Sequence, residues 1–147
     1  MAYDIQLRLP ERWLSECDTY EDESGAVITH FEATLPSHKP EVPVAFIDVY
    51  AGEMPEDESA EDQAFSNYAD TVGFSDDDPE DFNPIFKIKF NGRNAWGFDA
   101  LCEGDTPMRF LSQEVRKGLL AIIVFGAADE KKLASLHEII EKNLRIK

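Results

Sequence analysis

The chain has 147 residues, a length that fits one domain, and we expect a single domain over residues 1–147. Its hydrophobic content of 43% excludes a globally disordered chain, and its formal net charge of −16 argues against nucleic acid as a partner, because phosphates would be repelled. No signal peptide is visible, and the longest apolar run is far shorter than the ~20 residues of a membrane-spanning helix. The sequence therefore predicts a soluble, cytoplasmic protein without membrane contact.

The first half of the chain predicts strands followed by one helix. Residues 5–9 alternate between apolar and polar side chains, as in a half-buried strand. Residues 26–35 and 44–50 are rich in β-branched and aromatic side chains and predict two further strands. Residues 59–72 carry apolar side chains at three- and four-residue spacing. They predict an amphipathic helix whose N-cap is Ser59.

The second half predicts a meander of four antiparallel strands and a closing helix. The pair Asn91-Gly92 favours a two-residue type I′ hairpin turn, since both positions tolerate positive φ. The closing helix begins near Asp129 and presents one apolar face. The expected strands are residues 85–90, 94–101, 108–115 and 119–125, and the apolar face consists of Leu133, Leu136, Ile140 and Leu144. The predicted fold class is α+β, an antiparallel β-sheet with helices packed on it.

Four features occur in an order shared with a known superfamily. They are the strand end Leu9-Pro10 followed by Trp13, the helix at 59–72, the turn at 92–95, and the apolar strand 119–125 leading into the helix 129–144. The chain thereby resembles the superfamily of the PsbP subunit of photosystem II and the Ran-binding Mog proteins. The resemblance implies an α/β/α sandwich and a mostly non-enzymatic role, as in assembly factors, small-GTPase binders and bacterial effector chaperones. It transfers no site residue.

The negative charge is concentrated in one segment. Residues 41–86 contain fourteen Asp or Glu residues and no Lys or Arg, whereas the rest of the chain is nearly balanced. Localised charge can steer a partner. Two Phe residues flank the most acidic loop, and apolar anchors ringed by charge are typical of interfaces. We predict that a basic protein partner binds Asp76, Asp77, Asp78, Glu80, Asp81, Phe74 and Phe82. A purely solubilising role for the acids remains the alternative.

Motifs for catalysis or metal binding do not accompany the acidic segment. An EF-hand loop starting at Asp76 would need Gly at its sixth position and Glu at its twelfth, and these are Asp81 and Lys87. No Ser lies in a Gly-x-Ser-x-Gly elbow, and neither Cys belongs to a Cys-x-x-Cys pair. The sequence therefore predicts no catalytic residue, no metal site and no cofactor.

Two classes of function follow. The first is a non-enzymatic soluble binding protein (a chaperone, adaptor or assembly factor) that presents an acidic face to a basic protein partner, with a homodimer left open as its oligomeric state. The alternative is a small hydrolase or ligand-binding enzyme with a pocket between sheet and helices that involves His30, His38 and nearby acids. A deep pocket with convergent polar groups of perturbed pKa would favour the enzyme. A filled core with the charges outside would favour the binding protein.

Overall fold

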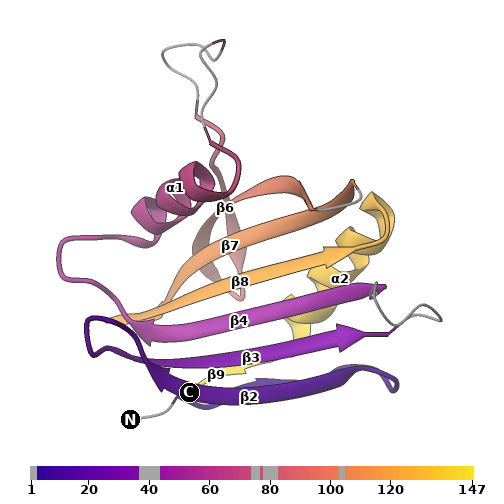
Figure 1. The fold of residues 1–147 in the computed structure, drawn as a ribbon, viewed down its shortest axis with the longest axis horizontal. Coiled ribbons are helices and arrows are strands. Elements are labelled where there is room, and N and C mark those ends of the chain that lie inside the picture. The colour runs from indigo at the N-terminus through magenta and orange to yellow at the C-terminus, as the bar shows by residue number, and fades with distance from the viewer. Residues whose placement is uncertain (1–2, 37–43, 74–76, 78–82, 103–104) are drawn as a thin grey trace.

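The chain forms a seven-stranded antiparallel sheet with one helix on each face (Figure 1). The computed structural model describes residues 3–36, 44–73, 77, 83–102 and 105–147. Within these ranges the elements are, in chain order, β1 (Ile5–Leu7), β2 (Leu14–Glu21), β3 (Val27–Leu35), β4 (Ala45–Glu53), α1 (Ala60–Thr71), β5 (Phe86–Phe90), β6 (Arg93–Cys102), β7 (Thr106–Arg116), β8 (Leu119–Ala127), α2 (Glu130–Asn143) and β9 (Leu144–Ile146).

The strand order in the large sheet is β2-β3-β4-β8-β7-β6-β5, and every neighbouring pair is antiparallel. The predicted meander of four strands is confirmed as β5 to β8. Strand β4 pairs with β8 and so joins the first three strands to the meander. The two terminal strands, β1 and β9, form a separate antiparallel ribbon. The predicted α+β class, with helices packed on an antiparallel sheet, is confirmed.

Two short elements differ from the sequence-based expectation. Strand β2 was not predicted, because all eight of its residues are exposed and its apolar positions do not alternate. It lies at the edge of the sheet, where pairing with β3 rather than burial holds it. The closing helix ends at Asn143, and Leu144 already belongs to β9, which pairs with β1. In both places backbone pairing outweighs the side-chain pattern.

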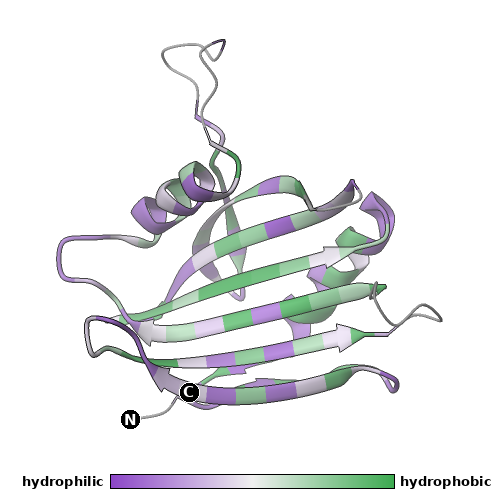
Figure 2. Cartoon of the chain, in the orientation of Figure 1, coloured by the Kyte–Doolittle hydropathy of each residue, from purple (hydrophilic) through white to green (hydrophobic). Residues whose placement is uncertain are grey.

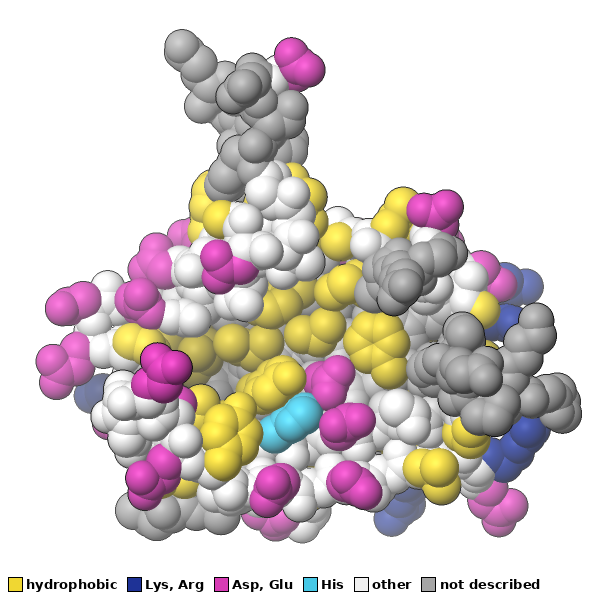
Figure 3. All heavy atoms as spheres, in the orientation of Figure 1, with side chains coloured by type: hydrophobic (Ala, Val, Ile, Leu, Met, Phe, Trp, Pro, Cys, Tyr) yellow, Lys and Arg dark blue, Asp and Glu magenta, His cyan; other side chains and the backbone are white. Residues whose placement is uncertain are grey.

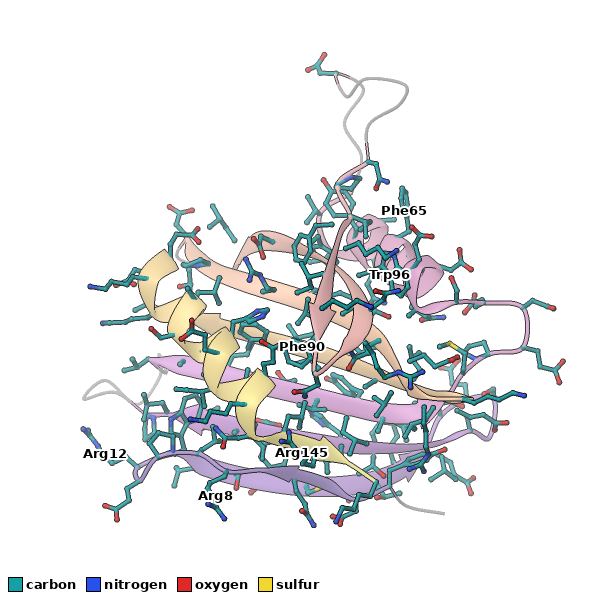
Figure 4. The ribbon with its side chains drawn as sticks, turned by 180° about the vertical axis from the view of Figure 1, so that it is seen from behind. Arg8, Arg12, Phe65, Phe90, Trp96 and Arg145 are labelled. Atoms are coloured by element: carbon teal, nitrogen blue, oxygen red, sulfur yellow. The ribbon has the colours of Figure 1, made fainter. Side chains whose placement is uncertain are left out.

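The main core lies between the sheet and α2. Figure 4 shows α2 crossing this face of the sheet, with Phe90 beside it. The predicted apolar face of the helix is confirmed for Leu133, Leu136 and Ile140, which are buried against the sheet. Leu144 is also buried, but it belongs to β9. On the sheet they meet a set of buried residues that includes Ile47, Val49, Phe90, Leu111, Ile123 and Phe125.

The predicted hairpin turn at Asn91-Gly92 is confirmed. Both residues have positive φ, 53° for Asn91 and 81° for Gly92, as a type I′ turn requires. The buried Gln113 side chain supports the turn from β7, because its Nε2 donates to the carbonyl oxygen of Phe90 at 2.6 Å and to that of Arg93 at 3.3 Å.

His137 of α2 lies half-buried over the same core. Its ring makes edge contacts with Phe90 and Phe125, at centroid distances of 5.4 and 5.8 Å. Its Nδ1 lies 3.2 Å from Arg109, whose guanidinium donates to both carboxylate oxygens of Asp99. Burial lowers the pKa of His137, and the positive charge of Arg109 lowers it further.

Replacing Gly92 with Val should lower the free energy of unfolding by about 1–3 kcal/mol, because a β-branched side chain resists positive φ. The space around Gly92 is open, so a clash does not contribute. Urea unfolding measures the effect. Gly92→Asn is the control, since Asn tolerates positive φ, and equal stability of the Val variant and the parent would contradict the turn.

Leu136→Ala should lower the free energy of unfolding by about 2–5 kcal/mol, because Leu136 is 5% exposed and truncation leaves a cavity under α2. The matched control is Leu101→Ala, since Leu101 is 63% exposed and its truncation should change stability by no more than about 0.5 kcal/mol. Equal effects of the two substitutions in urea unfolding would mark α2 as loosely packed.

His137 should make the fold less stable in acid. Folding lowers its pKa, so the unfolded chain takes up the proton first as the pH falls below about 6.5. The free energy of unfolding of the parent should therefore fall relative to that of His137→Gln between pH 7.5 and pH 5. Urea unfolding at several pH values measures the difference, and a constant difference across that range would refute the assignment.

Candidate functional site

Helix α1 covers one end of its face of the sheet. Its predicted start is confirmed, since Ser59 Oγ accepts from Asp62 N–H at 3.1 Å and Asp62 Oδ2 accepts from Ser59 N–H at 3.0 Å. The helix packs on β6 and β7, where Tyr68 meets the ring of Phe98 edge-on at 5.3 Å. Figure 4 shows Trp96 beneath this helix. Neither of the described helices lies on the rest of this face, over β8, β4 and β3 (Figure 1).

The exposure of the β4 side chains shows that this strand is covered on one side only. Its residues alternate between buried positions, which face α2, and half-buried positions, which face the other side. Figure 2 shows the same mixture of polar and apolar residues along β3 and β4, next to a largely hydrophobic β8. We call the uncovered region the open face, and define it by Ile28, His30, Glu32, Phe46, Asp48, Tyr50, Leu120, Ile122 and Val124. Figure 3 looks directly onto it.

A groove of about 780 Å³ occupies one end of the open face. Its floor is apolar and its walls are the turn at 22–26, the segment 53–56 and Gln63 of α1. The floor consists of Ile28, Tyr50, Leu120 and Ile122. The carboxylate of Asp22 holds the turn in shape by accepting from the backbone N–H groups of Ser24 and Ala26. Hydrogen bonds thus hold the turn that forms one wall of the groove, and the floor of the groove is apolar.

A cluster of titratable side chains adjoins the groove. His30 Nε2 lies 2.8 Å from Asp48 Oδ1, and the ring of His30 stacks on that of Tyr50 with centroids 4.3 Å apart and planes 6° apart. The nearest donor atoms of His30, Glu32 and Asp48 all lie within 4.8 Å of one another. Burial raises the pKa of Tyr50, as do the charges of Asp48, Tyr20 and Glu32, so its phenol stays protonated at neutral pH.

Negative charge dominates this half of the sheet. Strands β2, β3 and β4 together contain six acids and no Lys or Arg. The register places Asp18 opposite His30 and Glu16 opposite Glu32, on the same side of the sheet. We call Glu16, Asp18, Glu32 and Asp48 the acidic row. Figure 3 shows acidic side chains around the histidine of this face, beside a band of apolar side chains.

The predicted binding loop is largely beyond what the structure describes. Phe74, Asp76, Asp78, Glu80, Asp81 and Phe82 lie outside the described residues, and Asp77 is described and exposed. The prediction for this loop therefore stays a prediction.

Of the two histidines in the alternative enzyme site, only one lies within the described residues. His38 lies outside the described residues, and His30 lies on the open face instead of between sheet and helix. The space between the sheet and α2 is packed with buried apolar side chains. Sequence reasoning did find His30 with acids nearby, but it missed Asp48 and Tyr50. The sequence carries a partial signal, because His-x-Glu on one strand and Asp-x-Tyr on the next each place two side chains on one face of their own strand. The pairing register decides whether those two faces coincide.

Solved structures of other proteins are similar to this chain in fold. No protein-family model and no curated protein matches the chain. A protein from Bacteroides thetaiotaomicron VPI-5482 is similar in structure, with a TM-score of 0.52 and 14% identity over 97% of this chain and 45% of that chain. LpqN, involved in cell envelope biogenesis of Mycobacterium tuberculosis, has a TM-score of 0.50 and 13% identity over 99% of this chain and 84% of that chain. This chain is thus similar to LpqN in its fold, and spans under half the length of the Bacteroides protein.

The helices α1 and α2 have 12 and 14 residues. None of those in the described ranges has both the length and the apolar character needed to cross one.

Proposed function

We propose that this protein is a non-enzymatic binding protein that takes a basic segment of a partner protein on the open face. The observation that carries the proposal is the junction of the acidic row with the apolar groove on a part of the sheet that no described helix covers. The resemblance to the PsbP and Mog superfamily supports a binding role of the chaperone, adaptor or assembly-factor kind, and the shared fold with LpqN is compatible with it.

Charge would guide the partner to this face. The acidic row is not offset by any Lys or Arg within β2, β3 and β4. An unbalanced patch raises the local concentration of an oppositely charged partner and speeds association. The acids of residues 41–86 extend the same field beyond the sheet.

The groove would supply the apolar anchor. Ile28, Leu120 and Ile122 present an apolar floor, and Tyr50 offers an aromatic ring beside the acids. Interfaces commonly combine a central apolar pocket with a charged rim, and the anchor that fills the pocket sets the dissociation rate. We therefore expect a partner segment with Lys or Arg next to one bulky apolar residue.

The His30–Asp48 pair is the feature that an enzyme would use. Within the described part of the chain, the imidazole pairs with a carboxylate and stacks on a ring, and no hydroxyl or thiol is recorded in hydrogen-bond contact with it. Nucleophilic catalysis needs such a contact. This supports a binding role over a hydrolase that acts through a serine, threonine or cysteine nucleophile.

The test uses a partner isolated at low salt and then measured by surface plasmon resonance with purified variants. Removing three charges from the acidic row should slow association and weaken its dependence on salt, because steering acts through screened charge. Ile122→Ser should speed dissociation instead. The row variant combines Glu16→Gln, Asp18→Asn and Glu32→Gln, and its matched control removes three exposed acids elsewhere with Glu11→Gln, Glu130→Gln and Glu138→Gln.

A second variant separates the two acidic surfaces. It converts the five acids Asp76, Asp77, Asp78, Glu80 and Asp81 to amides, and Phe74→Ala and Phe82→Ala test the flanking anchors. If the loop variants weaken binding while the row variant and Ile122→Ser do not, the partner binds the loop and the open-face proposal is wrong. Binding that ignores salt and every one of these residues would make the acids a solubility device.

A further inference from the structure

We propose that His30, Glu32 and Asp48 form a binding site for a divalent metal ion of the zinc class. Their nearest donor atoms, one imidazole nitrogen and two carboxylate oxygens, lie within 4.8 Å of one another. Zinc sites use these donors at about 2.0–2.2 Å from the ion, so neighbouring donors in a tetrahedral shell stand roughly 3.3 Å apart. Small side-chain rotations therefore suffice to close the three donors around one ion.

The backbone holds the three side chains in place. Glu32 and Asp48 are direct cross-strand partners in the β3–β4 pair, and His30 lies diagonally from Asp48 on the same face. Both strands are interior strands of the sheet, so neither can slip in register without breaking a second pairing. The parallel stack with Tyr50 fixes the plane of the imidazole. Donors on rigid strands need little ordering when an ion binds.

A simple ion pair between His30 and Asp48 is the competing explanation. That pair accounts for two of the three groups, but it leaves the carboxylate of Glu32 next to them. Asp18 and Glu16 follow on the adjacent strand, and β2, β3 and β4 offer no Lys or Arg to offset them. Like charges gathered around an imidazole are unfavourable without a cation. A bound divalent ion removes that repulsion.

The donor set selects the kind of ion. Calcium and magnesium prefer shells made of oxygen alone, with six or more ligands, whereas an imidazole with carboxylates suits zinc and its neighbours in the first transition row. The His30 and Asp48 side chains are 21% and 26% exposed, so an ion can enter and water can complete its coordination. Three protein donors leave a fourth position open to water or to a further ligand.

The test measures the metal alone, so its result is independent of any partner protein. The full chain, stripped with a chelator and without a tag, is titrated with Zn²⁺ by calorimetry in 150 mM salt with excess Ca²⁺. We expect one ion per chain. His30→Gln and Asp48→Asn should each weaken binding by more than the ~10–100-fold that loss of an outer-shell partner costs. Circular dichroism verifies that each variant is folded.

Two matched controls should leave zinc binding unchanged. His137→Gln removes a histidine on the opposite side of the sheet, and Glu138→Gln removes an exposed acid of α2, also on that side. Co²⁺ absorption supplies a second readout, since nitrogen ligation and low coordination number change its visible spectrum, and the His30 ring resonances should shift in NMR. Zinc binding that is unaffected by His30→Gln, or several weak ions per chain that respond equally to Glu138→Gln, would overturn the proposal.

Discussion

The width of the sheet relative to a helix is the constraint on which the rest of the structure depends. Strands lie about 4.8 Å apart, so seven of them span roughly 30 Å, whereas a helix with its side chains is about 10–12 Å across. A single helix therefore shields about two or three strands. On one face α2 is joined by the β1–β9 ribbon, and together they bury the main core. On the other face α1 packs on β6 and β7, and the neighbouring strands are left to face water.

The composition of the uncovered strands follows from that exposure. A central strand with one side under α2 and the other toward solvent must alternate buried and half-buried residues, which is the pattern of β4. Its buried side is aliphatic. Its open side combines Asp48 with Phe46 and Tyr50, so it is neither a core nor an ordinary polar surface. One short helix thus determines where the core ends and which strands stay uncovered on this face.

The sequence predicted the helices and strands whose buried side chains recur at a regular spacing. It missed those that are held mainly by backbone pairing with a neighbouring strand. Leu136 and Ile140 repeat at helical spacing, and Asn91-Gly92 is a residue pair that type I′ hairpin turns prefer. The sequence therefore predicted both the helix and the turn. Strand β2 has no buried side chain, so its sequence does not show the alternation of apolar and polar residues that predicts a strand. The cluster around His30 was predicted only in part, for a different reason. Its third member, Asp48, is eighteen positions away in sequence and becomes a neighbour only through the β3–β4 register, which periodicity alone does not specify.

Tyr50 connects the two parts of the open face. Its ring lines the groove and also stacks on His30, which pairs with Asp48. A ligand that displaced Tyr50 from the groove floor would remove the surface that orients the imidazole, and an ion that fixed the imidazole would restrain Tyr50 in turn. Linkage requires that such an effect act equally in both directions on the two binding free energies. The charges add a second unfavourable coupling for a basic partner, because an ion among the carboxylates would reduce the field that attracts it. An ion at His30 and a basic segment on the acidic row would therefore oppose each other, whereas an apolar ligand confined to the groove would not experience that repulsion.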